Sequence, residues 1–574
     1  MRLHPLTPRK PELLANLAGY AVAVLTTVVA FLLIDLLYPP VAWVSATDSP
    51  QPATPSFLYS VLRLLLRSDL GYGWLDLLIG LIGFPERIVR AAISLDIGVS
   101  LTVRAVSALL IGVYAGLDIH SRMLANVFAE PVVAHVNGLR LLTGKAAIRS
   151  LAAAWFSRFG AGEPGVVLAP GLRLPRRLES EHILITGGTG AGKTTILRTI
   201  LDSAFGLGDR MLVLDVKGDM AATLPADSSS ILSLDDPRAA RWLIGRDIRS
   251  RSDALELAME LIPETSDPAW SSGARRVLAA LVQVLQRRSA ERRKIWDWRH
   301  LDALLCKPVV DLHALLSESH PVEASFIDVS NEATLKQAMS FYLVLITGAG
   351  MTASACAAAG GPVQSISIRE WAAGSGPQVL VLRQSQRQPE LSATIVRLVL
   401  KIVADAAVSQ ASQTPRANGD EPAPIWLALD ELPQIGKCAA VPRLAAIGRS
   451  AGVRLIAVVQ SPAQLREIYS TDAAQALIDN FATRIVGRVA SGQTAKEISD
   501  GWIGERTVRW FEETGVDANG RPRTESRTKD IPVVSPALLS DGLGLRSGPS
   551  GKAVVHALVI GHGDVARLSW PVGH

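Results

Sequence analysis

Few of the residues that build redox or metal centres occur in this chain. Its three cysteines, Cys306, Cys356 and Cys438, are far apart, and its ten histidines form no cluster. This spacing argues against a disulfide scaffold and a zinc site, and it is typical of a reducing compartment. The sequence also has no internal repeat, which argues against a solenoid, and no LSGGQ-like signature, which argues against a small-molecule ABC transporter.

A strong excess of charge of one sign is lacking as well. The chain has 58 basic and 53 acidic residues, a net charge of +5, so any nucleic-acid surface must be a local patch. Apolar residues are abundant, at 48% of 574 residues. That length allows several domains, and the apolar content leads us to expect a membrane segment.

Two apolar stretches near the N-terminus predict a pair of membrane-spanning helices. Leu17–Tyr38 carries one charge, Asp35, and as a helix it is about 33 Å long, enough for a hydrocarbon core of about 30 Å. A signal peptide is the alternative, but the run is long and no small-residue cleavage site follows it. Ile97–Leu117 is the second candidate. Because Arg104 is costly near mid-bilayer, a buried amphipathic helix is its alternative.

A glycine-rich loop lies between an apolar strand and a helix in the segment His182–Phe205. Its letters, GGTGAGKTT, fit the P-loop pattern, in which backbone N–H groups and a helix N-terminus converge on phosphate oxygens. Lys193 is predicted to reach the β- and γ-phosphates of ATP, and the Thr194 hydroxyl to bind Mg²⁺. An accidental match is the alternative, which the strand–loop–helix context disfavours. The predicted nucleotide-binding residues are Gly187, Gly188, Thr189, Gly190, Ala191, Gly192, Lys193, Thr194 and Thr195.

Further apolar strands, each ahead of a helical pattern, predict a doubly wound α/β fold. Strands that alternate with helices form a mostly parallel sheet with helices on both faces. The predicted strands are Met211–Val216, Gln378–Leu382, Ile425–Leu429, Arg454–Val459 and Arg484–Val489.

The buried strand Ile425–Leu429 ends at an acidic pair, Asp430 and Glu431. Ligands of parallel sheets bind at the carboxyl ends of the strands. Asp430 is therefore predicted to hold Mg²⁺, and Glu431 to polarise the attacking water. The alternative is a pair of carboxylates that cap the next helix.

The next strand ends at Gln460, which is predicted to sense the γ-phosphate; an ordinary helix cap is the alternative. Arg449, eleven residues earlier, is a candidate arginine finger for the nucleotide of a neighbouring subunit. Its alternative is a solvated or ion-paired arginine. No arginine near the P-loop itself is expected to meet the γ-phosphate, so we expect the site to be incomplete in a monomer.

The α/β alternation stops from Ile248 to Val363, and the helical patterns there predict an inserted all-α domain. The segment Arg287–His300 within it has six Lys or Arg against two acids, with Trp296 and Trp298. Such a mixture can hold phosphates and stack bases, whereas the alternative is a solvated helix end with two packed tryptophans. The candidate contacts are Arg292, Arg293 and Lys294.

In their order and spacing, these features resemble the TraD/TraG-type coupling proteins of type IV secretion systems, the ATPases of conjugative DNA transfer. The resemblance covers nearly the whole chain. It rests on the paired N-terminal spans and on TGGTGAGKTT, DVKGD, WSSGARRVL, SISIREW, LALDELPQIG, GRSAGVRLIAVVQS and LIDNFATRIVGRV, in that order.

The resemblance implies a RecA-like P-loop ATPase that uses ATP and Mg²⁺ as a homo-hexamer in the bacterial inner membrane. Such proteins recruit a relaxase–DNA complex and drive single-stranded DNA toward the components of the secretion channel. The family roles fall on Lys193 and Thr194 for phosphate and Mg²⁺, on Asp430 and Glu431 for the acidic pair, and on Arg449 and Gln460 for finger and sensor.

The expected organisation has four regions. They are a membrane anchor (1–117) with an external loop between its spans, a first NTPase part (118–247), the all-α insertion (248–363) and a second NTPase part (364–574). The NTPase domain is expected in the cytoplasm, where ATP is found. Some relatives dock the DNA-processing complex on a long acidic C-terminal tail, which this sequence lacks, so we expect docking on the insertion, at a surface that includes Arg292–Lys294. The alternative functions are a chromosomal DNA translocase of the same fold class and a nucleotide-gated receptor for protein substrates.

Overall fold

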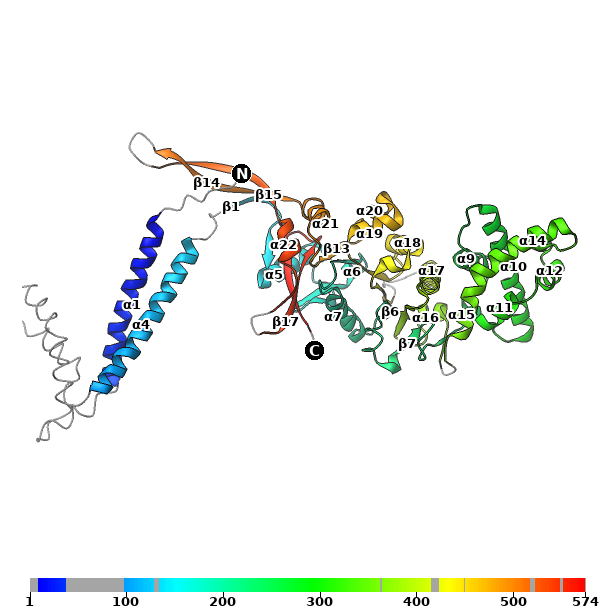
Figure 1. Ribbon diagram of the computed structural model, residues 1–574, viewed down its shortest axis with the longest axis horizontal. Helices are drawn as coiled ribbons and strands as arrows, with labels where there is room; N and C mark the ends of the chain where they lie inside the picture. The colour runs from blue at the N-terminus through cyan, green and yellow to red at the C-terminus, as the bar shows by residue number, and fades with distance from the viewer. Residues whose placement is uncertain are drawn as a thin grey trace, which may run out of the picture. The chain divides into compact units, whose positions relative to one another are not determined.

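The computed structural model describes residues 9–37, 98–127, 134–361, 364–413, 423–448, 450–516, 522–547 and 551–572 (Figure 1). They fall into two compact units. One consists of residues 1–134 and 509–527, and the other of residues 135–508 and 528–574. Each unit is considered by itself. The expected external loop lies outside the described residues, as does Arg449.

The first unit contains two long apolar helices, α1 (Arg9–Leu37) and α4 (Gly98–Val127), which pack along each other. Small residues make this close approach possible, because a Cβ added to Gly116 would lie 2.7 Å from the Cβ of Ala23. His120 and Asn16 join the helices through a 2.7 Å side-chain hydrogen bond.

Three helical stretches are long and apolar enough to cross a membrane, judged by length and composition: Asn16–Ile34, Val103–Ser121 and Glu332–Ala358. The first two match the expected pair, but the second begins six residues later than expected. Arg104 therefore lies at the end of that stretch rather than near its middle, which lowers the cost of its charge. The third was not expected, and it buries Ala338, Phe341 and Leu345 within the helical insertion of the second unit.

The second unit is built on an eleven-stranded sheet with the order β2-β18-β17-β13-β5-β12-β11-β6-β10-β7, where β16 pairs with β17. The pairs from β13 to β7 are parallel, whereas β17 runs antiparallel to its neighbours β13, β16 and β18. The strands are β2 (Leu141–Thr143), β5 (Ile183–Thr186), β6 (Arg210–Asp215), β7 (Ser229–Leu232), β10 (Val379–Arg383), β11 (Ile425–Leu429), β12 (Val453–Val459), β13 (Thr483–Val486), β16 (Gly544–Ser547), β17 (Ala553–Ile560) and β18 (Val565–Pro571).

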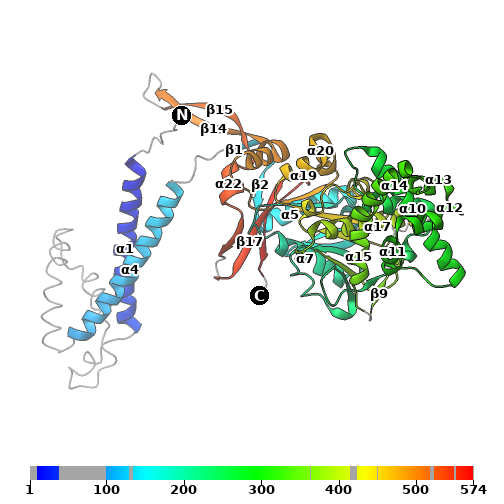
Figure 2. The same ribbon diagram turned by 45° about the vertical axis from the view of Figure 1, so that its right-hand side comes forward.

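Helices cover both faces of this sheet, which is why its central strands are mostly apolar. Along β11, Leu427 and Leu429 belong to one buried cluster, whereas Trp426 and Ala428 belong to the other. The helices α5 (Gly144–Phe159) and α7 (Lys193–Gly206) lie on the Trp426 face, and α17 (Pro389–Gln413) and α18 (Ala440–Ile447) on the opposite face. Figure 2 shows α7 and α17 against the sheet.

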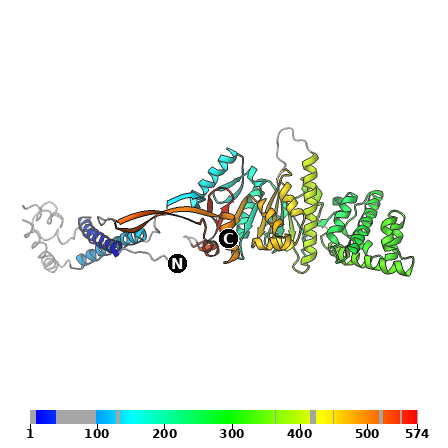
Figure 3. The ribbon, with the colours of Figure 1, turned by 90° about the horizontal axis from the view of Figure 1, so that it is seen from above.

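Residues 251–358 contain helices and no strand. The helices are α9 (Arg251–Leu261), α10 (Pro268–Arg292), α11 (Trp298–Leu305), α12 (Val309–Ser317), α13 (Pro321–Ala324), η3 (Ser325–Ile327), α14 (Glu332–Leu345), the π-helix η4 (Ile346–Gly350) and α15 (Met351–Ala358). Side-chain caps at Ser250, Asp297 and Asn331 begin α9, α11 and α14. In Figure 3, α17 stands between the sheet and these helices, which form one end of the unit.

The two ends of this insertion meet at one buried aspartate. Asp247 accepts hydrogen bonds from Trp242 Nε1 (2.6 Å), Ser367 Oγ (2.6 Å), and the backbone N–H groups of Ile368 (3.0 Å) and Arg369 (2.9 Å). Beside it, the short strands β8 (Arg241–Trp242) and β9 (Ser365–Ile366) pair in parallel. The chain thus leaves and rejoins the α/β part at one point.

Shorter elements complete the chain. β3 (Pro164–Ala169) and β4 (Leu172–Pro175) pair with each other, and β1 (Ala134–Gly138), β14 (Glu505–Val516) and β15 (Pro522–Pro532) form a sheet in that order. The others are α6 (Arg176–Glu179), η2 (Ala226–Ser228), α8 (Ile244–Asp247), α16 (Ile368–Ala372), η5 (Leu432–Ile435), α19 (Pro462–Tyr469), α20 (Thr471–Asp479), α21 (Gln493–Glu497), η6 (Ile498–Ile503) and α22 (Pro536–Asp541).

Candidate functional site

The glycine-rich loop joins the end of β5 to the start of α7, as its pattern predicts. Gly190 and Gly192 have positive φ angles of 72° and 83°, which side chains rarely adopt. A Cβ on Gly192 would also lie 2.4 Å from Val555 of β17, and a Cβ on Gly187 would lie 2.8 Å from the Cβ of Ala191. The loop therefore needs glycine for its backbone angles and for its close packing.

Lys193 begins α7 and turns back toward the loop. Its Nζ donates hydrogen bonds to the carbonyl oxygens of Gly187 (2.6 Å) and Gly188 (3.2 Å). Burial lowers the pKa of Lys193, and the charges of Glu431 and Asp430 oppose that shift. The ammonium group is thus held at the mouth of the loop within the field of the acidic pair.

The acidic pair follows β11, which is separated from β5 by β12 alone. Asp430 is 4% exposed, and its pKa is raised to about 6, first by burial and then by the charge of Glu431; Lys217 and Lys193 lower it. Glu431 has a φ of 63°, a left-handed conformation that costs a non-glycine residue about 1–3 kcal/mol. Such strain, over-determined by the surrounding structure, is common at functional sites.

Gln460 lies at the end of β12, between the P-loop strand and the acidic strand. Its Nε2 donates a 2.6 Å hydrogen bond to Oε1 of Glu431, and its backbone N–H donates to Gln464 Oε1 (3.0 Å). The structure therefore brings Lys193, Asp430, Glu431 and Gln460 to one edge of the sheet, from three adjacent strands.

The chemistry of these groups fits a magnesium nucleotide. The Thr194 hydroxyl and the Asp430 carboxylate are hard oxygen donors of the kind that Mg²⁺ prefers. A divalent cation beside Asp430 would favour the ionised carboxylate, which burial disfavours. The N-terminus of α7, together with Lys193, offers positive charge to phosphates.

The structure also places an arginine at the P-loop that the sequence analysis did not identify. Nη2 of Arg488 donates a 3.2 Å hydrogen bond to the carbonyl of Thr189, and the carbonyl of Arg488 accepts the N–H of Gly188 at 2.7 Å. Sequence reasoning missed it because Arg488 is about 300 residues away along the chain. Only the pairing of β13 with β5 makes them neighbours. Lys217, in the DVKGD segment after β6, was also missed, because only the pairing of β6 with β11 brings its charge near Asp430.

The basic patch is only partly as expected. Arg292, Arg293 and Lys294 are exposed at the C-terminal end of α10. Trp296 and Trp298, however, are each 3% exposed, and Trp298 packs edge-on against Trp242. Buried indoles cannot stack on bases, so the packed-tryptophan alternative is correct for them. The contact role of the three cations stays a prediction.

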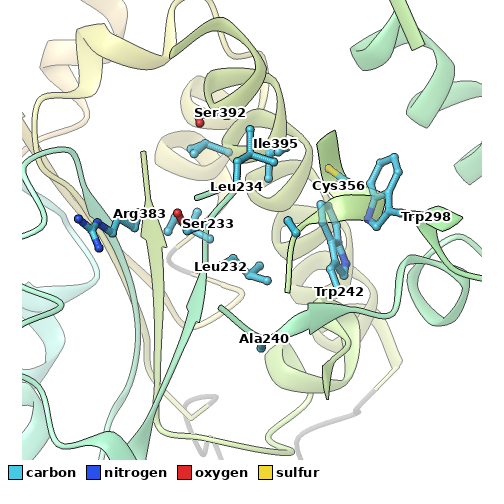
Figure 4. Close-up of a pocket in the computed structure, with 13 residues that line it drawn as sticks. Leu232, Ser233, Leu234, Ala240, Trp242, Trp298, Cys356, Arg383, Ser392 and Ile395 are labelled. Atoms are coloured by element: carbon cyan, nitrogen blue, oxygen red, sulfur yellow. The ribbon is translucent and has the colours of Figure 1, made fainter. Parts of the chain in front are cut away.

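A separate cavity lies beyond the ends of β7 and β10, against α17 and α15. Its lining includes Leu232, Trp242, Trp298 and Cys356 (Figure 4), and none of the predicted site residues. This apolar pocket lies where the insertion meets the sheet, away from the P-loop strand.

The fold and the site together define a P-loop NTPase with a helical insertion. Residues 166–547, more than half of the chain, match the family described as the type IV secretion-system coupling protein DNA-binding domain. The chain belongs to this family, which confirms the resemblance drawn from its motifs.

Individual relatives agree. The chain is 27% identical to the coupling protein TraD of Escherichia coli (strain K12) over 349 residues, 58% of this chain and 45% of that protein. It therefore spans about half the length of this relative. The solved structure of the bacterial conjugative coupling protein TrwBdeltaN70 with sulphate has a TM-score of 0.59 at 22% identity, covering 78% of this chain and 97% of that one. TrwB in complex with ADP and Mg²⁺ has a TM-score of 0.57 at 22% identity, with 78% and 96% covered. These structures confirm the fold.

Proposed function

We propose that this chain is a membrane-anchored ATPase that couples ATP hydrolysis to DNA transfer. In this proposal it recruits a relaxase–DNA complex and drives single-stranded DNA into a type IV secretion channel. The observation that carries it is the convergence of Lys193, Asp430, Glu431 and Gln460 at one sheet edge. Family membership supports the DNA-transfer role, and the relatives' described complexes with ADP, Mg²⁺ and ATP analogues support the nucleotide.

In the proposed reaction, residues 187–195 bind the phosphates through backbone N–H groups, and Lys193 neutralises charge on the β- and γ-phosphates. Thr194 and Asp430 would hold Mg²⁺, which would supply further charge neutralisation. Glu431 accepts the proton of the attacking water. The hydrogen bond from Gln460 orients the carboxylate of Glu431, and the Gln460 amide would sense the terminal phosphate.

The assembly and location follow from the same reasoning. The helices α1 and α4 anchor the chain in the bacterial inner membrane. The cytoplasmic NTPase domain begins after α4 rather than at residue 118, and consists of residues 135–247, 364–508 and 528–574. Residues 248–363 form the all-α domain. We propose a homo-hexamer in which Arg449 reaches the nucleotide of the next subunit. Because such a finger can contribute about 10³–10⁵ in rate, activity should rise steeply with protein concentration.

Two variants test the nucleotide assignment. Lys193→Ala should reduce ATP hydrolysis below detection without loss of folding, because the lysine supports phosphate charge rather than core packing. Glu431→Gln should bind ATP but leave it unhydrolysed, since an amide cannot accept the proton. Steady-state hydrolysis and bound-nucleotide analysis measure both effects. Normal turnover by Lys193→Ala would refute the assignment.

DNA dependence separates the proposed role from that of a receptor for protein substrates. A DNA-transfer ATPase should hydrolyse ATP faster when single-stranded DNA is added. A receptor for protein substrates alone should show no such stimulation, and that result would refute the proposed role in DNA transfer.

A further inference from the structure

The segment after β13 is attached to the phosphate-binding loop by its backbone. The N–H of Gly487 donates to the carbonyl of Thr186 (2.8 Å), and the N–H of Gly188 donates to the carbonyl of Arg488 (2.7 Å). Because β13 pairs in parallel with β5, both strands deliver their next residues to the same edge. Arg488 is thus fixed in place relative to the P-loop of its own subunit.

The side chain of Arg488 lies over the crest of the loop. Its Nη2 is 3.2 Å from the carbonyl oxygen of Thr189, and a Cβ on Gly190 would lie 3.7 Å from the same nitrogen. On the other side, Gly544 has a φ of 83°, and a Cβ there would lie 3.0 Å from the Cβ of Arg488. The absence of a side chain at Gly544 therefore leaves room for Arg488 beside the loop.

The guanidinium has capacity left for an anion. Arg488 is exposed, and the hydrogen bond to Thr189 uses one of its five N–H donors. In the part of the chain that the structure describes, no carboxylate lies within ion-pairing distance of it. A cation without a counter-ion beside a phosphate-binding loop points to the phosphates themselves as its partner.

We propose that Arg488 contacts the terminal phosphates of the nucleoside triphosphate bound in its own subunit and acts there as a catalytic arginine in cis. This inference rests on the proposed ATPase function. During hydrolysis, the water oxygen bonds to the γ-phosphorus while the bond from that phosphorus to the β–γ bridging oxygen breaks. The bridging oxygen keeps the electron pair as part of ADP, and the water proton passes to Glu431 and then to solvent. Arg488 donates N–H hydrogen bonds throughout and loses no proton.

Removal of Arg488 should affect the binding of nucleoside triphosphate more than the binding of diphosphate. Arg488→Ala should lower the rate of hydrolysis roughly 10²–10³-fold, the usual cost of one charge-stabilising donor. It should weaken binding of a non-hydrolysable ATP analogue more than binding of ADP. Arg488→Lys should recover part of the rate, because it keeps the charge but loses the planar fork. Arg173→Ala is a matched control, since Arg173 is also exposed and donates to one backbone carbonyl, that of Gly165; it should behave as the parent.

Mixed rings test whether Arg488 acts in cis. When Arg488→Ala and Lys193→Ala are co-expressed with different affinity tags and rings with both are purified, every site lacks one of the two cations. Hydrolysis should therefore stay as low as in the separate variants. The pair Arg449→Ala and Lys193→Ala should instead recover activity, because some interfaces join an intact P-loop to an intact finger.

These experiments distinguish a failure of the proposed function from a failure of the proposed role of Arg488. A parent whose hydrolysis does not depend on Lys193 would overturn the proposed function. If hydrolysis does depend on Lys193, three results would overturn the role of Arg488 alone. These are parental activity of Arg488→Ala, an equal loss of affinity for ADP and for the ATP analogue, or rescue of Arg488→Ala by Lys193→Ala in mixed rings.

Discussion

Two buried aspartates of this protein have opposite surroundings. Asp247, at the junction of the helical insertion, is fully buried and accepts four hydrogen bonds from groups on both sides of that junction. Asp430 is 4% exposed and lies among the charges of Glu431, Lys193 and Lys217. Burial is the first cause of a raised pKa for both.

The difference shows that a buried carboxylate can either stabilise the fold or bind a cation, depending on its neighbours. The partners of Asp247 come from the protein itself, so the hydrogen bonds that it accepts stabilise one arrangement of the chain. The charge of Asp430 is opposed by burial and by a neighbouring carboxylate, so a bound cation would stabilise it. Substitution at each position should therefore affect different properties.

The largest effect is expected on hydrolysis at Asp430. Asp430→Asn should lower the rate roughly 10²–10³-fold, because an amide binds Mg²⁺ less well than a carboxylate and one charge-stabilising group is lost. Steady-state hydrolysis across a Mg²⁺ titration measures the effect, with Asp235→Asn, an exposed aspartate, as the control. If the activity and its Mg²⁺ dependence are unchanged, Asp430 does not bind the metal ion.

The same position should make stability depend on pH. Because the pKa of Asp430 is raised from 3.8 to about 6 in the folded protein, the folded state binds more protons than the unfolded state between these values. The contribution of Asp430 to the free energy of unfolding should therefore fall as pH rises from about 4 to about 6, by up to about 3 kcal/mol.

Asp430→Asn removes this dependence, so its Tm should exceed that of the parent above pH 6 and approach it near pH 4. Thermal unfolding without nucleotide, at a series of pH values, measures the difference. Parallel Tm profiles for the two proteins would contradict the raised pKa.

At the junction, Asp247→Asn should lower the free energy of unfolding by about 2 kcal/mol. It should leave the nucleotide site of the folded protein unchanged. An amide NH₂ group cannot accept hydrogen bonds, so donors among Trp242, Ser367, Ile368 and Arg369 lose their partner. Thermal unfolding should show a lower Tm, with the ATP affinity of the folded protein retained. A variant as stable as the parent would mean that the junction does not depend on this carboxylate.

The smallest effect is expected in the basic patch. Charge reversal of Arg292, Arg293 and Lys294 should weaken DNA or relaxase binding and leave basal hydrolysis intact. If the cations contact phosphates, the slope of binding against salt concentration should fall by about one per lost contact. Reversal of Lys145 and Arg149, exposed on α5, is the control. Identical salt series for the patch variant and the parent would contradict the assignment.

Local pattern predicted much of this fold. Period and composition identified β6, β10, β11, β12 and β13 to within three residues at either end, and the helical stretch between β6 and β10, but they did not identify the parallel strand β7. The glycine spacing identified the loop between β5 and α7, because the positive φ angles of such a loop depend on its own residues. The pair Asp430 and Glu431 could be placed because the carboxyl ends of parallel strands share one edge.

Only the tertiary structure decided which distant residues meet. Strand order brings Arg488 to the P-loop and Val555 against Gly192, and folding of the insertion buries Trp298 and joins Asp247 to Ser367. None of these contacts leaves a local signal, since each joins segments that are distant in sequence and adjacent only through sheet pairing or helix packing. The sequence by itself therefore determined the parts of the nucleotide site that lie next to a strand end, while packing decided which further charges surround it.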